Sequence, residues 1–311
     1  MPRILISTSS FVVENNRHLN FLESRGFEII LNPYARRLSE TEIAELLQGN
    51  VVGMIAGVEP LTRKVFQCAP NLKVVSRCGI GMDSVDIVAA KDMGIWLSNT
   101  PDAPTMAVAE LAIAIMLDLL RRVSEADRNI RSGNWKPLMG NLLSCQTIGI
   151  IGYGRIGKKV CQILKSFGSK LLIYDKCQVD PDPGIEVVSL EYLLSSSDIV
   201  SLHVPYEPST HHLIDGDRLS VMKPGAFLVN VSRGGLVDED EFYVALSNGK
   251  LAGAGLDAFE QEPYLGPLRE LPNVVLTAHM GSYAKESRMQ MEREAAANLI
   301  QGLIAQGMIK N

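Results

Sequence analysis

The fold of this 311-residue chain is decided by the stretch Thr147-Ile148-Gly149-Ile150-Ile151-Gly152-Tyr153-Gly154-Arg155-Ile156-Gly157. Its first five residues predict a buried strand, and Lys158–Phe167 predicts a helix that begins directly after the glycines. A second apolar run, Leu171–Tyr174, predicts a strand that ends at Asp175. Strand, glycine turn, helix, strand and acid in this order form the fingerprint of a dinucleotide-binding fold.

Each glycine of this fingerprint has a physical role in binding a dinucleotide. Gly152 permits the tight turn, Gly154 lets the backbone approach a pyrophosphate, and Gly157 lets the helix pack closely on the strand. The helix start presents free N–H groups and a partial positive charge to the phosphates. Asp175 can accept both hydroxyls of an adenine ribose and would repel a 2′-phosphate, so the sequence predicts NAD rather than NADP. The predicted cofactor-binding residues here also include Tyr153, Arg155 and Ile156.

Composition and charge restrict the class of protein. Hydrophobic residues make up 46% of the chain, which suits buried parallel strands, and the net charge is −5. No basic cluster stands out, so no nucleic-acid partner is expected. The five cysteines show no metal-ligand spacing, and we expect no metal and buried free thiols in a reducing compartment. The N-terminus does not read as a signal peptide and Val108–Leu120 is too short to span a membrane, so we expect a cytoplasmic location without membrane contact.

Apolar runs alternate with helical patterns along the chain, which predicts parallel sheets with crossover helices. The strands expected before the fingerprint are Ile4–Ser7, Gly53–Ala56, Val74–Ser76 and Trp96–Ser98, with helices at Ser39–Leu47 and Ser84–Met93. The strands expected after it are Ile199–His203, Ala226–Val231, Ala252–Leu256 and Val274–Thr277, with a last helix at Ala284–Gln306.

One long helix is predicted over Met106–Ile130, because apolar residues recur there at helical spacing. Two interpretations of its apolar face stay open. It can be a connector that packs on a domain, or it can form an interface between two copies of the chain. We expect a homodimer.

Three strand ends after the fingerprint deliver Arg233, Glu262 and His279. Open α/β sheets bind ligands at the carboxyl ends of their strands. Hydride transfer at a 2-hydroxy acid needs a fixed carboxylate, a proton acceptor at the hydroxyl and a dry nicotinamide face. Arg233 offers a planar fork for a carboxylate, and His279 can take or return the hydroxyl proton.

Glu262 can bond the other ring nitrogen of His279 and fix its tautomer, although Glu260 competes for this role. Singly, the arginine could be a surface ion-pair residue, the glutamate a solvated loop acid, and the histidine a satisfied buried side chain. Together, in this order after a nucleotide-binding pattern, they favour a hydride-transfer site.

With these residues in place, the chain resembles the D-isomer-specific 2-hydroxyacid dehydrogenases over nearly its whole length, and most of all their D-3-phosphoglycerate dehydrogenase-like members. The resemblance implies an α/β fold of two Rossmann-like, doubly wound parallel-sheet domains with a cleft between them. Residues 1–100 plus 282–311 would form a flavodoxin-like substrate domain, and residues 101–281 an NAD-binding Rossmann domain. Besides the glycine run, the matching segments are Val74–Asp86, Asn99-Thr100-Pro101, Val108-Ala109-Glu110-Leu111, His203-Val204-Pro205, the run through Arg233, Asp257–Pro263 and His279.

The resemblance also implies roles for individual residues. Arg233, Glu262 and His279 would be catalytic. Asp175 would bind the adenine ribose of NAD. On the adenine side, the other cofactor-binding residues would be His203, Val204, Pro205 and Thr210. Further cofactor-binding residues would be Val231, Ser232, Asp257 and Val108. The substrate, a small 2-hydroxy or 2-oxo acid, would contact Gly57, Val58, Arg77 and Gly79 together with Arg233 and His279.

Two departures from the resemblance leave the substrate open. The segment Ala56-Gly57-Val58-Glu59 lacks the arginine that phosphoglycerate-specific members commonly carry there, and the sequence stops at Asn311, so we expect a short form without the regulatory domain of longer members. The predicted reaction is hydride transfer between NAD and a D-2-hydroxy acid, with 3-phosphoglycerate as one candidate. A glyoxylate or hydroxypyruvate reductase is the alternative, and an NAD-sensing, corepressor-like binding protein is a third, non-enzymatic interpretation.

Overall fold

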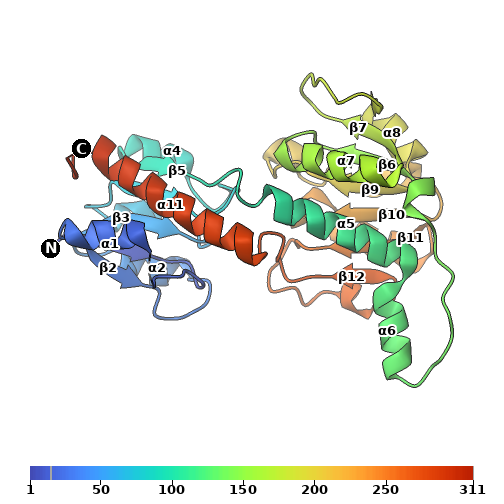
Figure 1. Cartoon of the computed structure of the whole chain (residues 1–311), viewed down its shortest axis with the longest axis horizontal. Coiled ribbons are helices and arrows are strands. Elements are labelled where there is room, and N and C mark those ends of the chain that lie inside the picture. The colour runs from blue at the N-terminus through green and yellow to red at the C-terminus, as the bar shows by residue number, and fades with distance from the viewer. Residues whose placement is uncertain (15, 311) are drawn as a thin grey trace. The chain divides into compact units, whose positions relative to one another are not determined.

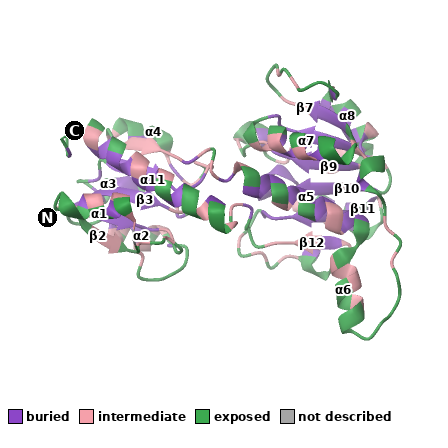
Figure 2. Ribbon diagram, in the orientation of Figure 1, coloured by how far each residue is buried: buried purple, intermediate pink, exposed green. Residues whose placement is uncertain are grey.

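The computed structural model describes residues 1–14 and 16–310, and the chain divides into two compact units. The first unit combines residues 1–104 with the segment that begins at Ser282, and the second is Thr105–Gly281. Each unit contains one parallel β-sheet with helices on both of its faces (Figure 1), which confirms the predicted α/β class and the two parallel-sheet domains. Buried residues gather in the strands and on the helix faces that cover them (Figure 2).

The first unit is built on a five-stranded sheet. Its strands are β1 (Arg3–Ile6), β2 (Glu28–Leu31), β3 (Val51–Ala56), β4 (Val74–Arg77) and β5 (Trp96–Ser98), and its helices are α1 (Arg17–Ser24), α2 (Glu40–Leu46), α3 (Arg63–Gln67), α4 (Ile87–Asp92) and α11 (Lys285–Ala305). The strand order is β2-β1-β3-β4-β5. Helices α1 and α11 cover one face of the sheet, and α2, α3 and α4 cover the other.

Helix α11 packs on the first sheet although it follows the second unit in the sequence. Ser76 of β4 donates a hydrogen bond from Oγ to the Ala295 carbonyl of α11 at 2.8 Å. A Cβ on Gly302 would lie 2.5 Å from Val74 Cγ1 and 2.5 Å from Trp96 Cε3. The helix therefore approaches β4 and β5 more closely than any side chain at this position would allow.

The second unit is built on a seven-stranded sheet. Its strands are β6 (Thr147–Ile151), β7 (Lys170–Tyr174), β8 (Ile185–Val187), β9 (Ile199–Leu202), β10 (Ala226–Asn230), β11 (Leu251–Leu256) and β12 (Val274–Leu276), and its α-helices are α5 (Thr105–Arg121), α6 (Val123–Arg131), α7 (Arg155–Phe167), α8 (Leu190–Ser196), α9 (Gly216–Val221) and α10 (Glu239–Ser247). Short 3₁₀ helices are η1 (Leu143–Cys145), η2 (Pro208–Thr210), η3 (Gly234–Leu236) and η4 (Pro267–Glu270).

The strand order β12-β11-β10-β9-β6-β7-β8 reverses direction between β6 and β9. Helices α5 and α7 cover one face, and α8, α9 and α10 cover the other. In a doubly wound sheet, the point where the strand order reverses is where a ligand can enter at the carboxyl ends of the strands. The glycine run follows β6 and His203 follows β9, so both lie at this point.

The prediction of a single helix over Met106–Ile130 is wrong. Arg122 has φ +55°, a left-handed conformation that cannot continue a right-handed helix, so α5 ends at Arg121 and α6 begins at Val123. The carboxylate of Asp118 stabilises the break, because it accepts hydrogen bonds from the backbone N–H of Ser124 at 2.7 Å and from the Ser124 hydroxyl.

The prediction that the cysteines are buried is wrong for three of the five. Cys78 and Cys161 are buried, and burial raises the pKa of the Cys78 thiol to about 11 and that of Cys161 to about 12. Cys68, Cys145 and Cys177 are exposed, and all five are free thiols. Within residues 1–14 and 16–310, no helix has the length and hydropathy that a membrane-spanning helix requires.

We predict that Gly302→Ala destabilises the protein by about 1–3 kcal/mol, because the added methyl overpacks the contact of α11 with Val74 and Trp96. This cost exceeds the gain of about 0.5–1 kcal/mol that alanine brings to a helix interior. Urea denaturation followed by circular dichroism measures the change. The control is Gln301→Ala on the exposed side of the same helix, and it should leave the free energy of unfolding unchanged. A Gly302→Ala variant that is more stable than the unchanged protein would contradict the packing argument.

Candidate functional site

The glycine run joins β6 to α7 in a turn that requires glycine at residues 152 and 157. Gly152 has φ +97°, which favours glycine, and a Cβ on Gly157 would lie 2.0 Å from the carbonyl oxygen of Gly152. By contrast, a Cβ on Gly154 would meet no atom within 4 Å. Gly152 and Gly157 are therefore required by the fold itself, whereas the absence of a side chain at Gly154 keeps the start of α7 accessible.

Asp175 follows β7 and lies beside the glycine run. Its Oδ2 accepts a hydrogen bond from the backbone N–H of Tyr153 at 2.7 Å, and its Oδ1 accepts one from Cys177 at 2.9 Å. The N-cap residue of α7 is Gly154, which has no side chain to cap the first turn, and there Arg155 is exposed and Ile156 is half-buried. A fixed carboxylate, a glycine at the N-cap and open space around Gly154 together fit the ribose and pyrophosphate of a dinucleotide.

The predicted adenine-side residues form one loop after β9. His203 is 8% exposed and its Nε2 lies 2.9 Å from Ser201 Oγ. Its Nδ1 is buried and has no hydrogen-bond partner among residues 1–14 and 16–310. Burial lowers the pKa of His203 to about 3, so the imidazole is neutral. The loop continues through half-buried Val204 and exposed Pro205, whose carbonyl accepts a hydrogen bond from Thr210 Oγ1 at 3.0 Å.

Glu262 and His279 meet at the carboxyl ends of β11 and β12. The Nδ1 atom of His279 lies 2.9 Å from Oε1 and 2.9 Å from Oε2 of Glu262. Glu262 Oε1 also accepts a hydrogen bond from the Phe259 backbone at 3.2 Å. The competing residue, Glu260, instead places its Oε1 2.7 Å from Nε2 of His212, so Glu262 is the carboxylate that faces His279.

The turn that carries His279 is held by Asp257, which is 1% exposed. The Asp257 carboxylate accepts hydrogen bonds from the backbone N–H groups of Met280 and Gly281, at 2.8 Å each, and from Thr277 Oγ1 at 2.5 Å. His279 itself has φ +50°, which is uncommon for a residue with a side chain. A contact of Asp257 with nicotinamide stays a prediction. Its structural role was not foreseen, because two of its three partners are backbone groups that no side-chain pattern reveals.

Val108 lies on α5 beside this turn. A Cβ on Gly281 would lie 3.3 Å from Val108 Cγ2 and 3.1 Å from Asp257 Oδ2. The buried valine therefore packs directly against the turn that carries His279, and its predicted contact with the cofactor remains a prediction.

Arg233 follows β10, the neighbour of β11 in the sheet. Its Nη1 donates a hydrogen bond to the Ser232 carbonyl at 2.8 Å, and its own carbonyl accepts one from Asn230 Nδ2 at 2.7 Å. Ser232 Oγ donates to the Leu202 carbonyl of β9 at 3.0 Å, and Val231 is buried. Asn230 was not predicted as part of the site, yet it folds the strand end that presents the guanidinium.

In the first unit, Gly57 and Val58 follow β3. The Gly57 N–H donates to Ser7 Oγ at 3.2 Å and to Glu59 Oε1 at 3.0 Å, while Val58 is exposed. Glu59 is 1% exposed and also accepts a hydrogen bond from the Ser7 hydroxyl. Glu59 was not predicted as part of the site, and its buried carboxylate holds the loop that carries Gly57.

Arg77 and Gly79 follow β4 in the same unit. Arg77 is buried. Gly79 has φ +150°, and a Cβ on this glycine would lie 2.5 Å from Nη1 of Arg77. The Gly79 N–H donates to Thr100 Oγ1 at 2.8 Å. The guanidinium thus lies against the Gly79 backbone, and direct contact of these residues with a substrate stays a prediction.

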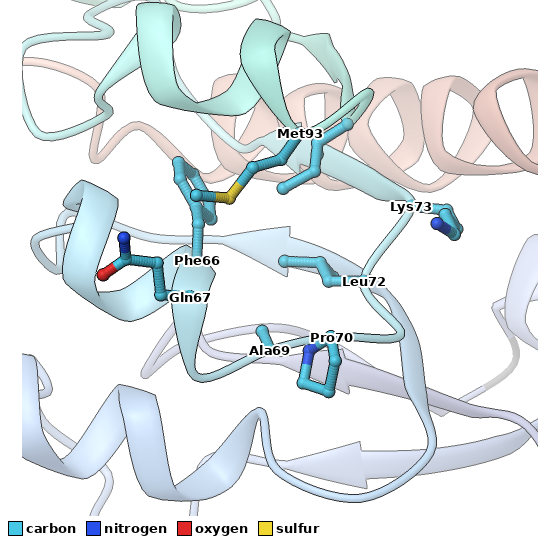
Figure 3. A pocket seen from close by; sticks show the side chains of 8 residues that line it. Phe66, Gln67, Ala69, Pro70, Leu72, Lys73 and Met93 are labelled. Atoms are coloured by element: carbon cyan, nitrogen blue, oxygen red, sulfur yellow. The ribbon is translucent and has the colours of Figure 1, made fainter.

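A hollow of about 190 Å³ lies elsewhere in the first unit (Figure 3). Most of its lining is apolar, with Phe66, Leu72 and Met93 around it and Lys73 at one side. Lys73 directly precedes β4, whereas Gly79 follows the end of that strand. The hollow is therefore at the opposite end of the strand from the predicted substrate residues.

The sequence model of the D-isomer specific 2-hydroxyacid dehydrogenase, NAD binding domain, matches residues 113–281. The chain belongs to this family. It is accordingly an NAD-dependent oxidoreductase whose second unit contains the matched NAD-binding domain, as the glycine run and Asp175 indicated.

Several curated relatives are similar over most of this chain. A glyoxylate reductase of Korarchaeum cryptofilum is 44% identical over 253 residues, which are 78% of this chain and 76% of the relative. A hydroxypyruvate reductase of Thermotoga maritima is 35% identical over 275 residues, covering 86% and 90%. A D-3-phosphoglycerate dehydrogenase of Synechocystis is 36% identical over 269 residues, covering 84% of this chain and 48% of the relative.

Among solved structures, the D-lactate dehydrogenase of Aquifex aeolicus, complexed with NAD and lactic acid, has a TM-score of 0.85 and 29% identity. The match covers 98% of this chain and 96% of the dehydrogenase. Both units of the chain thus have counterparts in a structure that contains NAD.

We predict that Gly154→Ala and Gly157→Ala separate cofactor binding from folding. Gly154→Ala should keep the melting temperature but weaken NAD binding by on the order of tenfold, about 1.4 kcal/mol, because the methyl occupies space near the helix start. Gly157→Ala should lose both stability and binding, because its Cβ cannot fit beside Gly152. Calorimetric titration with NAD and thermal denaturation measure the two effects, and equal loss of stability in both variants would contradict the assignment.

Proposed function

We propose that this chain reduces a small, unphosphorylated 2-oxo acid of the glyoxylate or hydroxypyruvate type with NADH, and that Arg233, Glu262 and His279 are its catalytic residues. The observation that carries the proposal is the pairing of His279 Nδ1 with both carboxylate oxygens of Glu262 at 2.9 Å, in the unit that contains the NAD-binding domain. The pair supplies a proton donor whose orientation is fixed.

The chain's own residues bind the acid and move one proton. When bound, NADH supplies the hydride that C2 of the 2-oxo acid accepts. The Arg233 guanidinium binds the carboxylate of the acid, because its planar fork matches two carboxylate oxygens. Nε2 of His279 donates a proton to the C2 oxygen, which becomes the hydroxyl of the product, and in the reverse direction the same nitrogen accepts it.

Glu262 selects which nitrogen of His279 performs this transfer. A carboxylate can only accept hydrogen bonds, so Nδ1, which faces Glu262, must carry a proton. This leaves Nε2 for the substrate oxygen. The Phe259 N–H donates a hydrogen bond to the Glu262 carboxylate at 3.2 Å. The backbone of the loop thus holds the carboxylate that orients His279, the proposed proton donor.

Two observations favour an unphosphorylated substrate over 3-phosphoglycerate. The relatives from Korarchaeum cryptofilum and Thermotoga maritima carry the names of reductases of glyoxylate and hydroxypyruvate, the alternative that the sequence analysis kept open. The segment Ala56–Glu59, in which phosphoglycerate-specific members commonly carry an arginine, contains none. Its one charged side chain, Glu59, is an acid and cannot bind a phosphate as a guanidinium does. Substrate contacts of Gly57, Val58, Arg77 and Gly79 are part of this proposal.

The same proposal includes a homodimer formed through the segment from α6 to η1. Trp135 and Met139 are each 88% exposed, and further exposed apolar side chains of this segment are Val123, Ile130 and Leu142. Exposed apolar residues gathered in one segment mark an interaction surface, and an interface between identical chains is the common case. A cytoplasmic location stays a prediction of the sequence.

We predict that the purified protein oxidises NADH with glyoxylate or hydroxypyruvate and turns over 3-phosphohydroxypyruvate far more slowly. His279→Asn should lower kcat by about 10²- to 10⁴-fold, since it removes the proton donor, and should leave the dissociation constant of NADH unchanged. NADH absorbance measures turnover, and fluorescence titration measures binding.

His18→Asn, in α1 of the first unit, is the control and should keep the full kcat. Unchanged turnover in His279→Asn would sink the catalytic assignment, and a preference for 3-phosphohydroxypyruvate would sink the substrate assignment. NADH binding without turnover of any 2-oxo acid would favour the corepressor-like alternative.

We predict that the double variant Trp135→Lys and Met139→Lys sediments as a monomer, whereas the unchanged protein sediments with the mass of two chains. Two charges placed in an apolar interface cost more than the contact contributes. Leu265→Lys is the matched control, because Leu265 is also exposed but lies outside the segment. A dimer that survives the double variant refutes this interface.

A further inference from the structure

The loop that carries Glu262 has no regular secondary structure of its own. Residues 257–266 follow β11 and belong to no helix or strand. The direction of the Glu262 side chain therefore depends on what holds this loop, rather than on a backbone ladder. The bond from Phe259 N–H to Glu262 is internal to the loop and cannot by itself fix the loop on the rest of the unit.

Two bonds at Glu260 tie the loop to its surroundings. The Glu260 N–H donates to Glu239 Oε1 at 2.8 Å, and Glu260 Oε1 lies 2.7 Å from His212 Nε2. Because a carboxylate has no proton to donate, the His212 ring must donate this bond. The Phe259–Glu260 peptide also lies directly against Gly234, where a Cβ would lie 1.8 Å from the Phe259 carbonyl carbon.

His212 is itself held from several sides. Its backbone N–H donates to the Gly235 carbonyl at 2.8 Å, its ring stacks on His211 with centroids 3.8 Å apart, and its Nδ1 lies 3.3 Å from Asp238 Oδ2. Its φ of +48° is uncommon for a residue with a side chain. Such a backbone is kept only where surrounding contacts hold it, and often it is found where a side chain must point in one direction.

These contacts connect the two loops that carry the proposed catalytic residues. Gly235 belongs to η3, which begins directly after Arg233, and His212 is bonded to it through its backbone. The same histidine reaches Glu260, two residues before Glu262. His212 thus bonds through its backbone to the segment after β10 and through its ring to the loop after β11, two segments that also touch at Gly234.

We propose that His212 and Glu260 are positioning residues: their bond holds the Glu262 loop against the Arg233 segment and thereby keeps Glu262 directed at His279. This inference rests on the proposed function, because it acts through the pair of Glu262 and His279. Glu260, which competed with Glu262 as the partner of His279 on sequence grounds, acquires a separate role that its partner His212 defines.

The test compares single and double variants in steady-state turnover of glyoxylate with NADH. Glu260→Ala should lower kcat by about tenfold with KM for NADH unchanged, because only the geometry of the proton donor is disturbed. Glu260→Gln should restore most of kcat, since its amide oxygen can still accept the His212 bond. His212→Asn, which tolerates a positive φ but is too short to reach Glu260, should repeat the loss.

A double variant at Glu262 and Glu260 separates a positioning role of Glu260 from a general loss of structural stability. In a Glu262→Gln background, Glu260→Ala should cause less than about a twofold further loss, because residues that act through one another are not additive. Glu186→Ala is the matched control: Glu186 forms an exposed ion pair with Lys170 in the same unit, at 3.3 Å, and its loss should leave kcat unchanged. Thermal denaturation of each variant shows that it is folded.

The outcomes distinguish the two proposals. If Glu262→Gln lowers kcat while Glu260→Ala and His212→Asn keep it, the positioning role is wrong and the proposed function stands. Full multiplication of the two losses in the double variant, or failure of Glu260→Gln to restore kcat, also overturns the positioning role. If Glu262→Gln itself turns over at the unchanged rate, the proposed function fails and the positioning role fails with it.

Discussion

The interaction on which the candidate site depends is the burial of the Asp257 carboxylate under the turn that carries His279. A buried charge is stable only when donors surround it, and here two backbone N–H groups and the Thr277 hydroxyl do so. Their bonds close the turn and keep His279 in a left-handed backbone conformation that costs about 1–3 kcal/mol. The histidine ring faces Glu262 because the turn beneath it cannot relax.

The site is built from loops on a rigid sheet. Strands β10, β11 and β12 are neighbours in the parallel sheet, so the segments that follow them leave the same edge. Above that edge the backbone ladders end, and side chains take over the connections: His279 with Glu262, and His212 with Glu260. The sheet fixes where each loop begins, and the side-chain hydrogen bonds fix how the loops face one another. A catalytic site needs both, because its reacting groups must be held at a defined distance and orientation.

Two strands, β2 and β8, were missed, and both lie at the edge of a sheet and contain exposed positions. The other edge strands, β5 and β12, contain no exposed position and were predicted. The break at Arg122 was missed because the helical spacing of apolar residues continues across it, while the turn depends on a bond from Asp118. The helix start at Ser39 was predicted correctly, because its capping box with Glu42 is a local feature.

By itself, the sequence determined the glycine run with Asp175, the family, and three residue types suited to hydride transfer, because each depends on neighbours along the chain or on a pattern of spacing. The tertiary structure decided which glutamate faces His279 and which faces His212, and it revealed Asp257, Asn230 and Glu59 as supports. Both glutamates belong to one loop, and the residues alone left both as possible partners of His279, although the family resemblance favoured Glu262. The partners are chosen by how that loop packs against Gly234 and the turn after β12, a contact between segments distant in the chain.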